Sequence, residues 1–143
     1  MKILLTGPFG NVGSHTIPEL LREGHQIRAF DLDNPATRKV AKELGKKVET
    51  AWGDVRDARA VARAVEGVDA VLHLAALIPP GSDEDPAGTR AVNVDGTANV
   101  VKAAQGRSRK PKVLLVSTFD VHGHTQSLAI TLPPLGVVIF KKQ

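Results

Sequence analysis

Three glycines near the start of the chain, Gly7, Gly10 and Gly13, recur in the pattern G-x-x-G-x-x-G. An apolar run at residues 3–5 precedes them, and apolar residues at helical spacing follow as far as Gly24. In this order of strand, glycine turn and helix, the first amides of the helix can bind a diphosphate without side chains in the way. Gly7 would permit the tight turn, Gly10 would admit the phosphates, and Gly13 would let the helix pack closely on the strand. We therefore predict a dinucleotide-binding turn.

The carboxylate of Asp31 follows the second predicted strand, residues 26–30. At this position in a dinucleotide-binding unit, a carboxylate accepts hydrogen bonds from both ribose hydroxyls and repels a 2′-phosphate. The sequence therefore favours NAD over NADP as the cofactor. The alternative is that Asp31 only begins a turn, as aspartate often does.

A second carboxylate, Asp54, follows the third predicted strand, residues 48–51. It lies at the strand end where open parallel sheets bind ligands, so its side chain could face an adenine ring. An aspartate near a helix start can also be an N-cap, and both interpretations remain open. Asp57 is a further candidate for the cap of the helix that follows.

The fourth predicted strand, residues 70–74, is followed by Ala75 and Ala76. These small residues would either leave room for a cofactor over the strand end or pack against a helix. His73 lies within the apolar run and is predicted to be a core histidine with satisfied hydrogen bonds rather than a base or ligand. A fifth strand, residues 113–116, brings Thr118 to its carboxyl end.

Helices alternate with these strands, at residues 35–44, from Asp57 to about residue 65, and from Asp85 to Gly106. Asn34 is predicted to cap the first of them. This alternation predicts right-handed β-α-β units in an α/β fold. The expected architecture is a three-layer, Rossmann-like, doubly wound parallel sheet of about five strands, with a possible tail strand, because near-continuous apolar strands are typical of sheets covered on both faces.

The composition of the 143-residue chain is that of one globular domain, with 42% hydrophobic and 24% charged residues. We expect a cytoplasmic protein, because no apolar run is long enough for a membrane span and no secretory signal is visible. The absence of cysteine excludes thiol chemistry and thiolate metal sites, and we expect no metal. The net charge is +4, and the basic cluster at residues 107–112 is interpreted as a solvated loop. Aromatic residues are scarce, so we expect no nucleic-acid partner.

Together these motifs resemble the extended short-chain dehydrogenase/reductase family, and most of all its NAD-dependent nucleotide-sugar epimerases and dehydratases. The resemblance runs from residue 1 to about residue 124 in the family's order and spacing. It rests on residues 6–16 (TGPFGNVGSHT), Asp31, residues 53–55 (GDV), 73–76 (HLAA), 93–97 (NVDGT) and 117–123 (STFDVHG).

The resemblance implies a set of cofactor-binding residues and one catalytic hydroxyl. The implied cofactor-binding residues are Gly7, Gly10, Asn11, Val12 and Gly13 at the diphosphate, Asp31 at the adenosine ribose, Asp54 and Val55 at the adenine, and Leu74, Ala75, Ala76 and Asn93 towards the nicotinamide ribose. Thr118 falls where the family has a catalytic serine or threonine that hydrogen-bonds the reacting oxygen of the substrate. By its residue type alone, Thr118 is a hydroxyl at a strand end, which could equally cap backbone groups.

The chain also departs from the family pattern. The family's general acid/base is a tyrosine in a Tyr-x-x-x-Lys motif, and this chain contains no tyrosine. His122 stands where the family usually has a different, non-catalytic tyrosine; it is a conceivable substitute acid. Residues 127–140 are apolar and Pro-rich, and residues 135–140 could form one strand, whereas the family continues with a helix, a sixth strand and a substrate-binding domain.

We therefore expect an NAD-binding domain at residues 1–124, an atypical tail at residues 125–143 and no substrate domain. The implied reaction is hydride transfer on a nucleotide-sugar or a similar hydroxyl or carbonyl substrate, for which this chain alone would be incomplete. The alternative is a dinucleotide-binding module without turnover, either a fragment or a subunit that depends on a partner. A strand at the sheet edge would favour association with a second copy or a partner chain.

Overall fold

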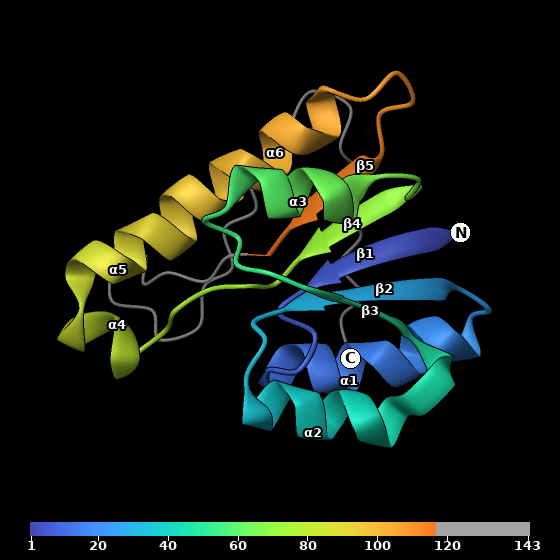
Figure 1. Cartoon of the computed structure of the whole chain (residues 1–143), viewed down its shortest axis with the longest axis horizontal. Coiled ribbons are helices and arrows are strands. Elements are labelled where there is room, and N and C mark those ends of the chain that lie inside the picture. Colours follow the sequence, from blue (N-terminus) through green and yellow to red (C-terminus); the bar gives the residue numbers. More distant parts are fainter. Residues whose placement is uncertain (117–143) are drawn as a thin grey trace, which may run out of the picture.

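Five parallel strands form one sheet in the computed structural model, which describes residues 1–116. Their order across the sheet is β3-β2-β1-β4-β5 (Figure 1). The strands are β1 (Lys2–Thr6), β2 (Gln26–Asp31), β3 (Glu49–Trp52), β4 (Ala70–His73) and β5 (Lys112–Leu115). The predicted α/β fold with a parallel, Rossmann-like sheet is confirmed.

Helices cover both faces of this sheet. Helices α1 and α2 lie on one face and α3 and α6 on the other, which makes three layers (Figure 1). The helices are α1 (Asn11–Arg22), α2 (Pro35–Leu44), α3 (Ala58–Val65), α4 (Gly81–Glu84), α5 (Pro86–Arg90) and α6 (Thr97–Gln105), with a short 3₁₀ turn η1 (Gly45–Lys47) and a π-helical segment η2 (Ala91–Gly96).

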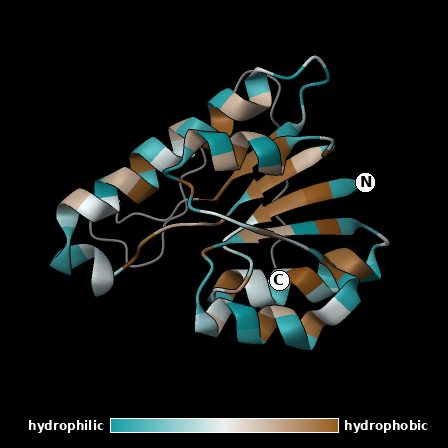
Figure 2. Cartoon of the chain, in the orientation of Figure 1, coloured by the Kyte–Doolittle hydropathy of each residue, from teal (hydrophilic) through white to brown (hydrophobic). Residues whose placement is uncertain are grey.

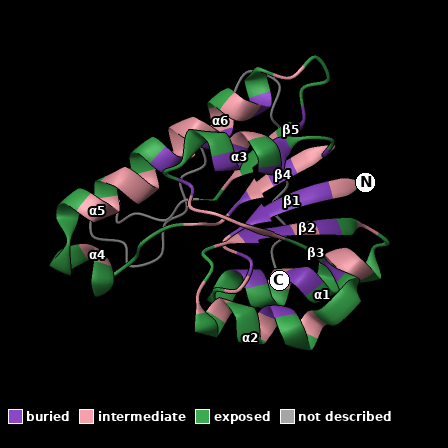
Figure 3. Cartoon of the chain, viewed as in Figure 1, coloured by how far each residue is buried: buried purple, intermediate pink, exposed green. Residues whose placement is uncertain are grey.

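The two apolar cores follow from the alternation of side chains along the strands. Leu4 faces α3 and α6 and belongs to a cluster with Val71 and Val100, whereas its neighbour Leu5 faces α1 and packs with Ile17. The central strands are accordingly apolar along their length (Figure 2) and buried (Figure 3). Because β1 is covered on both faces, its sequence is a continuous apolar run.

Helix ends lie where their capping residues predict. The Asn34 side chain accepts from the Thr37 amide at 3.0 Å, and the Thr37 hydroxyl accepts from the Asn34 amide at 3.1 Å. Pro35 is the first helical residue of α2. Asp57 caps α3 through the amides of Arg59 and Ala60, so the capping role considered for Asp54 belongs to Asp57 instead.

The long helix expected after Asp85 is divided into three parts, because its middle turn, η2, is π-helical. Gly96 is the buried residue of this turn, and a β-carbon there would lie 2.7 Å from the Val55 side chain. The wide turn thus lies where the helix packs closely against the loop after β3.

Thr118, His122, the possible tail strand and the expected tail at residues 125–143 lie outside the described residues. Across residues 1–116, no helix has both the length and the apolar character that a membrane crossing requires.

Candidate functional site

A cleft of about 340 Å³ opens at the carboxyl ends of the strands. The loops after β1, β2, β3 and β4 form its walls, and residues from α5 and η2 close one side. The lining residues are Gly7, Gly10, Phe30, Asp31, Leu32, Gly53, Asp54, Val55, Arg56, Leu74, Ala75, Ala76, Leu77, Asp85, Gly88 and Val92. Strand β1 lies between β2 and β4, which is the point where the chain reverses its direction of progress across the sheet. Ligands of open α/β sheets bind in the crevice at this point.

The three glycines of the turn differ in what surrounds them. Gly7 has a positive φ of 65°, and a β-carbon there would lie 2.9 Å from the Ala75 backbone. A β-carbon at Gly13 would lie 2.5 Å from the Pro8 carbonyl oxygen, so at this residue the start of α1 packs against the turn, while Ile17 further along the helix packs on the strand. At Gly10 the nearest atom would be the Gly7 oxygen at 3.5 Å, an ordinary contact. The fold itself requires glycine at positions 7 and 13 but not at position 10.

The N-terminus of α1 points its first amides out of the turn. The Ser14 amide donates to the Gly10 carbonyl at 2.9 Å, and the amides of Asn11, Val12 and Gly13 precede this first intrahelical bond. The N-cap, Gly10, has no side chain to accept from them, and the first turn contains no acidic residue. The donor set and the positive end of the helix dipole therefore fit a diphosphate, and the open space at Gly10 gives it access.

Asp31 connects the end of β2 to the glycine turn. Its carboxylate accepts from the Phe9 amide at 3.2 Å and from the Leu32 amide at 2.8 Å. Burial raises the pKa of this carboxyl, and the two amide hydrogen bonds oppose that effect. Asp31 thus holds the glycine turn and also lines the cleft, while its contact with a ribose stays a prediction.

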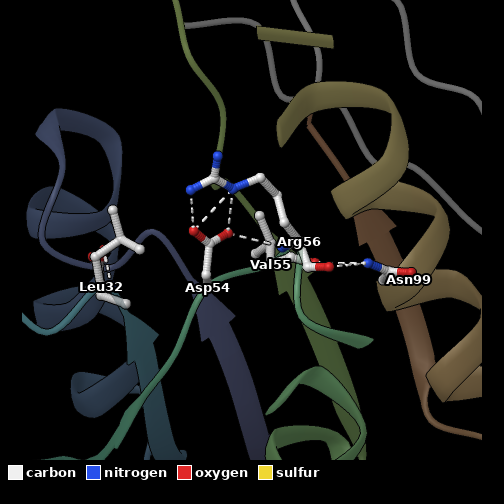
Figure 4. Close-up of polar contacts among 6 residues, drawn as sticks. Leu32, Asp54, Val55, Arg56 and Asn99 are labelled. Atoms are coloured by element: carbon white, nitrogen blue, oxygen red, sulfur yellow. Dashed lines mark hydrogen bonds and ion pairs between the residues drawn. The ribbon is translucent and has the colours of Figure 1, made fainter. Parts of the chain in front are cut away.

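Asp54 forms an ion pair with Arg56 at the rim of the cleft (Figure 4). Its carboxylate accepts from the Arg56 amide at 2.8 Å and from the guanidinium at 2.5–3.0 Å. These hydrogen bonds hold the pKa of Asp54 below its ordinary value. Leu32 lies on the opposite side of Asp54 from the Arg56 backbone (Figure 4), so the rim presents an apolar side chain, a carboxylate and a planar cation.

Asn99, on α6, holds the loop that carries this ion pair. Its side-chain amide donates to the Val55 carbonyl at 3.0 Å and to the Arg56 carbonyl at 3.1 Å (Figure 4). Sequence reasoning missed both Arg56 and Asn99. Proximity to Asp54 could have indicated Arg56, but the bonds of Asn99 join segments more than 40 residues apart and have no local signal.

The residues after β4 form the far wall of the cleft. Leu74, Ala75 and Ala76 line it, and the Thr6 hydroxyl accepts from the amides of Leu74 at 3.2 Å and Ala75 at 3.3 Å. Ala75 also packs against the core, as one interpretation of the small residues predicted, while room for a cofactor stays a prediction. His73 is 4% exposed and contacts Thr6 at 2.6 Å, which confirms it as a core histidine with hydrogen-bond partners.

Asn93 does not line the cleft. Its side chain donates to the Leu77 carbonyl and accepts from the Leu77 amide, each at 2.8 Å. It therefore holds the end of the loop after β4, which itself lines the cleft.

Two arginines of the basic cluster at residues 107–112 form internal contacts. Arg107 donates to the Ala62 carbonyl, and Arg109 pairs with Asp69 at 2.8 Å. In this part of the chain, no group of three or more histidine or acidic residues is placed to hold a metal ion.

Comparison with known proteins matches residues 4–131 to the 3-beta hydroxysteroid dehydrogenase/isomerase family. The chain is 35% identical over 111 residues to a 3-beta-hydroxysteroid dehydrogenase of Mycolicibacterium neoaurum, over 73% of this chain and 28% of that protein. It is 32% identical over 129 residues to a UDP-glucose 4-epimerase of Neisseria meningitidis serogroup C, over 85% of this chain and 38% of that protein.

The solved structure of a Thermus thermophilus UDP-glucose 4-epimerase in complex with NAD superimposes with a TM-score of 0.65 at 31% identity. That match covers 73% of this chain and 34% of the epimerase. The chain thus spans well under half the length of these relatives, which include both hydroxysteroid dehydrogenases and nucleotide-sugar epimerases.

Proposed function

Because the chain belongs to the 3-beta hydroxysteroid dehydrogenase/isomerase family, we propose that its cleft binds NAD as part of a hydride-transferring enzyme. The observation that carries this proposal is the contrast among the three glycines: Gly7 and Gly13 are needed by the fold, whereas the space at Gly10 is used by no residue of the turn. That space lies beside the first amides of α1, which are suited to a diphosphate.

Most of the residues proposed to hold the cofactor line the cleft, whereas Asn11, Val12 and Gly13 follow its lining residue Gly10 at the start of α1. Asn11 and Val12 would bind the diphosphate through their amides, with Gly7, Gly10 and Gly13 shaping the turn. Asp31 would hold the adenosine ribose, Asp54 and Val55 would border the adenine, and Leu74, Ala75 and Ala76 would lie beside the nicotinamide ribose. Bound NAD would supply the carbon that accepts a hydride from a substrate hydroxyl carbon.

The preference for NAD over NADP rests on Asp31. Its carboxylate lies in the cleft wall, and a 2′-phosphate placed against it would bring two negative charges together. The one basic side chain that lines the cleft within residues 1–116, Arg56, is already paired with Asp54. This arrangement supports discrimination against the phosphorylated cofactor.

The substrate class follows from the relatives and from the resemblance. The named relatives act on hydroxysteroids or on UDP-glucose, both of which carry a secondary hydroxyl, and we propose a nucleotide-sugar or a similar hydroxyl or carbonyl compound. Thr118 would hydrogen-bond the reacting oxygen of that substrate.

A second candidate function is a dinucleotide-binding module without turnover, either a fragment or a subunit that depends on a partner. The absence of tyrosine favours it, because the family's acid/base is a tyrosine. Both candidates share the NAD site.

The test is a calorimetric titration of the purified chain with NAD and, in parallel, with NADP. We expect binding with a preference for NAD. In Asp31→Ala, we expect weaker NAD binding and a preference reduced by about tenfold, since one charge-assisted contact and one repulsion disappear.

Circular dichroism of the same samples serves as the control for folding. A folded wild-type chain without affinity for NAD would overturn the proposed function, and an unchanged preference in a folded Asp31→Ala variant would overturn the role of Asp31.

A further inference from the structure

A row of hydrogen-bonded polar residues behind the cleft, buried at Thr6 and His73 and partly buried at Thr97 and Asn93, has no part in the proposed function so far. His73 Nδ1 lies 2.6 Å from the Thr6 hydroxyl, and His73 Nε2 lies 3.0 Å from the Thr97 hydroxyl. The Thr97 hydroxyl in turn donates to the Asn93 carbonyl at 2.7 Å. The row connects β1, β4 and α6, which are far apart in the sequence.

The direction of these hydrogen bonds follows from the number of donors at Thr6. Its hydroxyl oxygen already faces two donors, the Ala75 amide and the Leu74 amide, the second of which it shares with the Thr6 carbonyl at 3.2 Å. The Thr6 hydroxyl must therefore donate its own proton to His73 Nδ1. The neutral ring then carries its proton on Nε2 and donates it to Thr97, whose proton goes to the Asn93 carbonyl. Every member of the row is satisfied by one arrangement of protons.

The surroundings of His73 support a neutral ring. The residue is 4% exposed, and burial lowers the pKa of its imidazole to about 4. A protonated ring would carry a hydrogen on Nδ1 as well, facing the hydroxyl hydrogen of Thr6. The row is intact only when the imidazole is uncharged.

The row ends at Asn93, which also hydrogen-bonds the cleft wall through its side chain. The carbonyl of Asn93 accepts from Thr97, while the side chain of Asn93 forms two hydrogen bonds with the backbone of Leu77. Thr6 holds the amides of Leu74 and Ala75 at the other end of the same loop. Residues 74–77 are thus held at both ends, and His73 connects the two anchors.

We infer that the hydrogen-bonded row Thr6–His73–Thr97–Asn93 is a positioning device for residues 74–77, with His73 as its Nε2–H tautomer. These residues line the cleft on the side opposite Asp31. The consequence for ligands rests on the proposed function: the row sets the wall beside the nicotinamide half of NAD and leaves the adenosine half unaffected. His73 is a positioning residue and contacts no ligand itself.

The test compares Thr97→Val, which keeps the shape of the side chain and removes the hydroxyl, with Thr97→Ser, which keeps the hydroxyl. We expect Thr97→Val to bind NAD about tenfold more weakly, the effect of about one lost buried hydrogen bond, and to bind AMP as the wild type does. Thr97→Ser is expected to bind both as the wild type does. Equal weakening of NAD and AMP, or no weakening of NAD, would overturn the inference.

Two measurements without ligand examine the row directly. Nitrogen NMR of the wild-type imidazole is expected to show a protonated Nε2 and an unprotonated Nδ1; a proton on Nδ1 at neutral pH would overturn the inference. Amide hydrogen exchange at Leu74, Ala75 and Leu77 is expected to be faster in Thr97→Val than in the wild type. Unchanged exchange there would also overturn it.

Val100→Ala is the matched control, because Val100 is fully buried on the same helix and lies outside the row. It is expected to lower overall stability without a selective change in residues 74–77 or in NAD relative to AMP. If the wild type binds neither NAD nor AMP, the proposed function fails, while the NMR and exchange measurements still decide whether the row exists and orders the loop.

Discussion

The residues around Gly10 leave room for a side chain, so the fold does not require glycine at this position. The backbone there is extended, with φ near −76°, and a β-carbon would meet only the Gly7 oxygen at 3.5 Å. We therefore expect Gly10→Ala to unfold at nearly the wild-type temperature and to bind NAD at least about tenfold more weakly, because the methyl group would occupy the phosphate position. Thermal unfolding and calorimetry of one preparation measure both effects.

Gly13→Ala is the contrasting variant. Its β-carbon would lie 2.5 Å from the Pro8 carbonyl oxygen, so the turn must move and stability is expected to fall by about 1–3 kcal/mol. If Gly10→Ala retained full affinity for NAD, the three glycines would serve only to form the turn and would have no role in binding the diphosphate.

His73 makes stability depend on pH in a predictable direction. Its folded-state pKa of about 4 lies below the ordinary value of 6.5, so the folded state binds fewer protons than the unfolded state between these values. The stability that depends on a neutral His73 is fully present above pH 6.5 and is lost as the pH falls towards 4. At 1.36 kcal/mol per pKa unit, the loss amounts to about 3 kcal/mol. Asp31, whose pKa is raised by burial, acts in the opposite direction because its protonated form is favoured by folding.

Urea unfolding at several pH values between 6.5 and 4 measures this loss, with His73→Gln as the comparison in which it is absent. A direct check is the NMR titration of the His73 ring, which is expected to remain neutral at pH 5.5. Protonation of the ring above pH 6 in the folded chain would contradict the prediction.

At the scale of elements, Arg28 joins three of them at the end of the sheet opposite the cleft. From β2 its guanidinium donates to the Ala64 carbonyl at 2.7 Å and the Glu66 carbonyl at 2.6 Å, at the end of α3. It also donates to Glu49 on β3 at 2.7 Å, and its side chain is only 13% exposed. These carbonyls have no helical partner, so Arg28 caps α3 from another element.

We expect Arg28→Met to lower the free energy of unfolding by about 1–3 kcal/mol, because the helix-end carbonyls and Glu49 lose a partly buried charged donor while the aliphatic packing is kept. Arg22→Met is the matched control: Arg22 pairs with Glu19 on the surface of α1, both side chains being mostly exposed, and is expected to change stability by less than about 1 kcal/mol. Urea unfolding measures the free energy of unfolding of both variants and of the wild type. Equal effects would show that Arg28 is no more than a surface charge.

At the scale of the whole molecule, the chain contains the cleft that we propose binds NAD, but its sequence has no tyrosine to serve as the family's acid/base. We expect the purified chain to bind NAD and to form no reduced nicotinamide when a hydroxysteroid or a UDP-sugar is added, because the tyrosine that removes the hydroxyl proton in the family is absent from its sequence. A full-length 3-beta-hydroxysteroid dehydrogenase in the same absorbance assay is the positive control.

Formation of reduced nicotinamide by this chain would contradict that prediction, and its loss in His122→Ala would then identify His122 as the substitute acid/base.

Association through a sheet edge, expected from the sequence, stays a prediction. In the described sheet, β3 and β5 are the edge strands.

Most of the fold could be predicted from the sequence, because its signals are local. The apolar runs, the glycine turn, the Asn34 cap and the Asp57 cap each act within a few residues, and all lie where the sequence indicated. The resemblance to the extended short-chain dehydrogenase/reductase family is confirmed by the family match and the relatives. The π-helical turn at Gly96 was not foreseen, because it depends on the approach of Val55 from a distant loop.

The sequence by itself determined the order of strands and helices, the glycine turn and the acidic residue beside it, because hydrophobic periodicity and turn chemistry are properties of neighbouring residues. Only the tertiary structure decided which glycine leaves space for a ligand, which loop Asn99 holds, and how His73 connects Thr6 with Thr97. Those features depend on contacts between residues that are tens of positions apart in the sequence, and the local pattern around one residue does not indicate its distant partner.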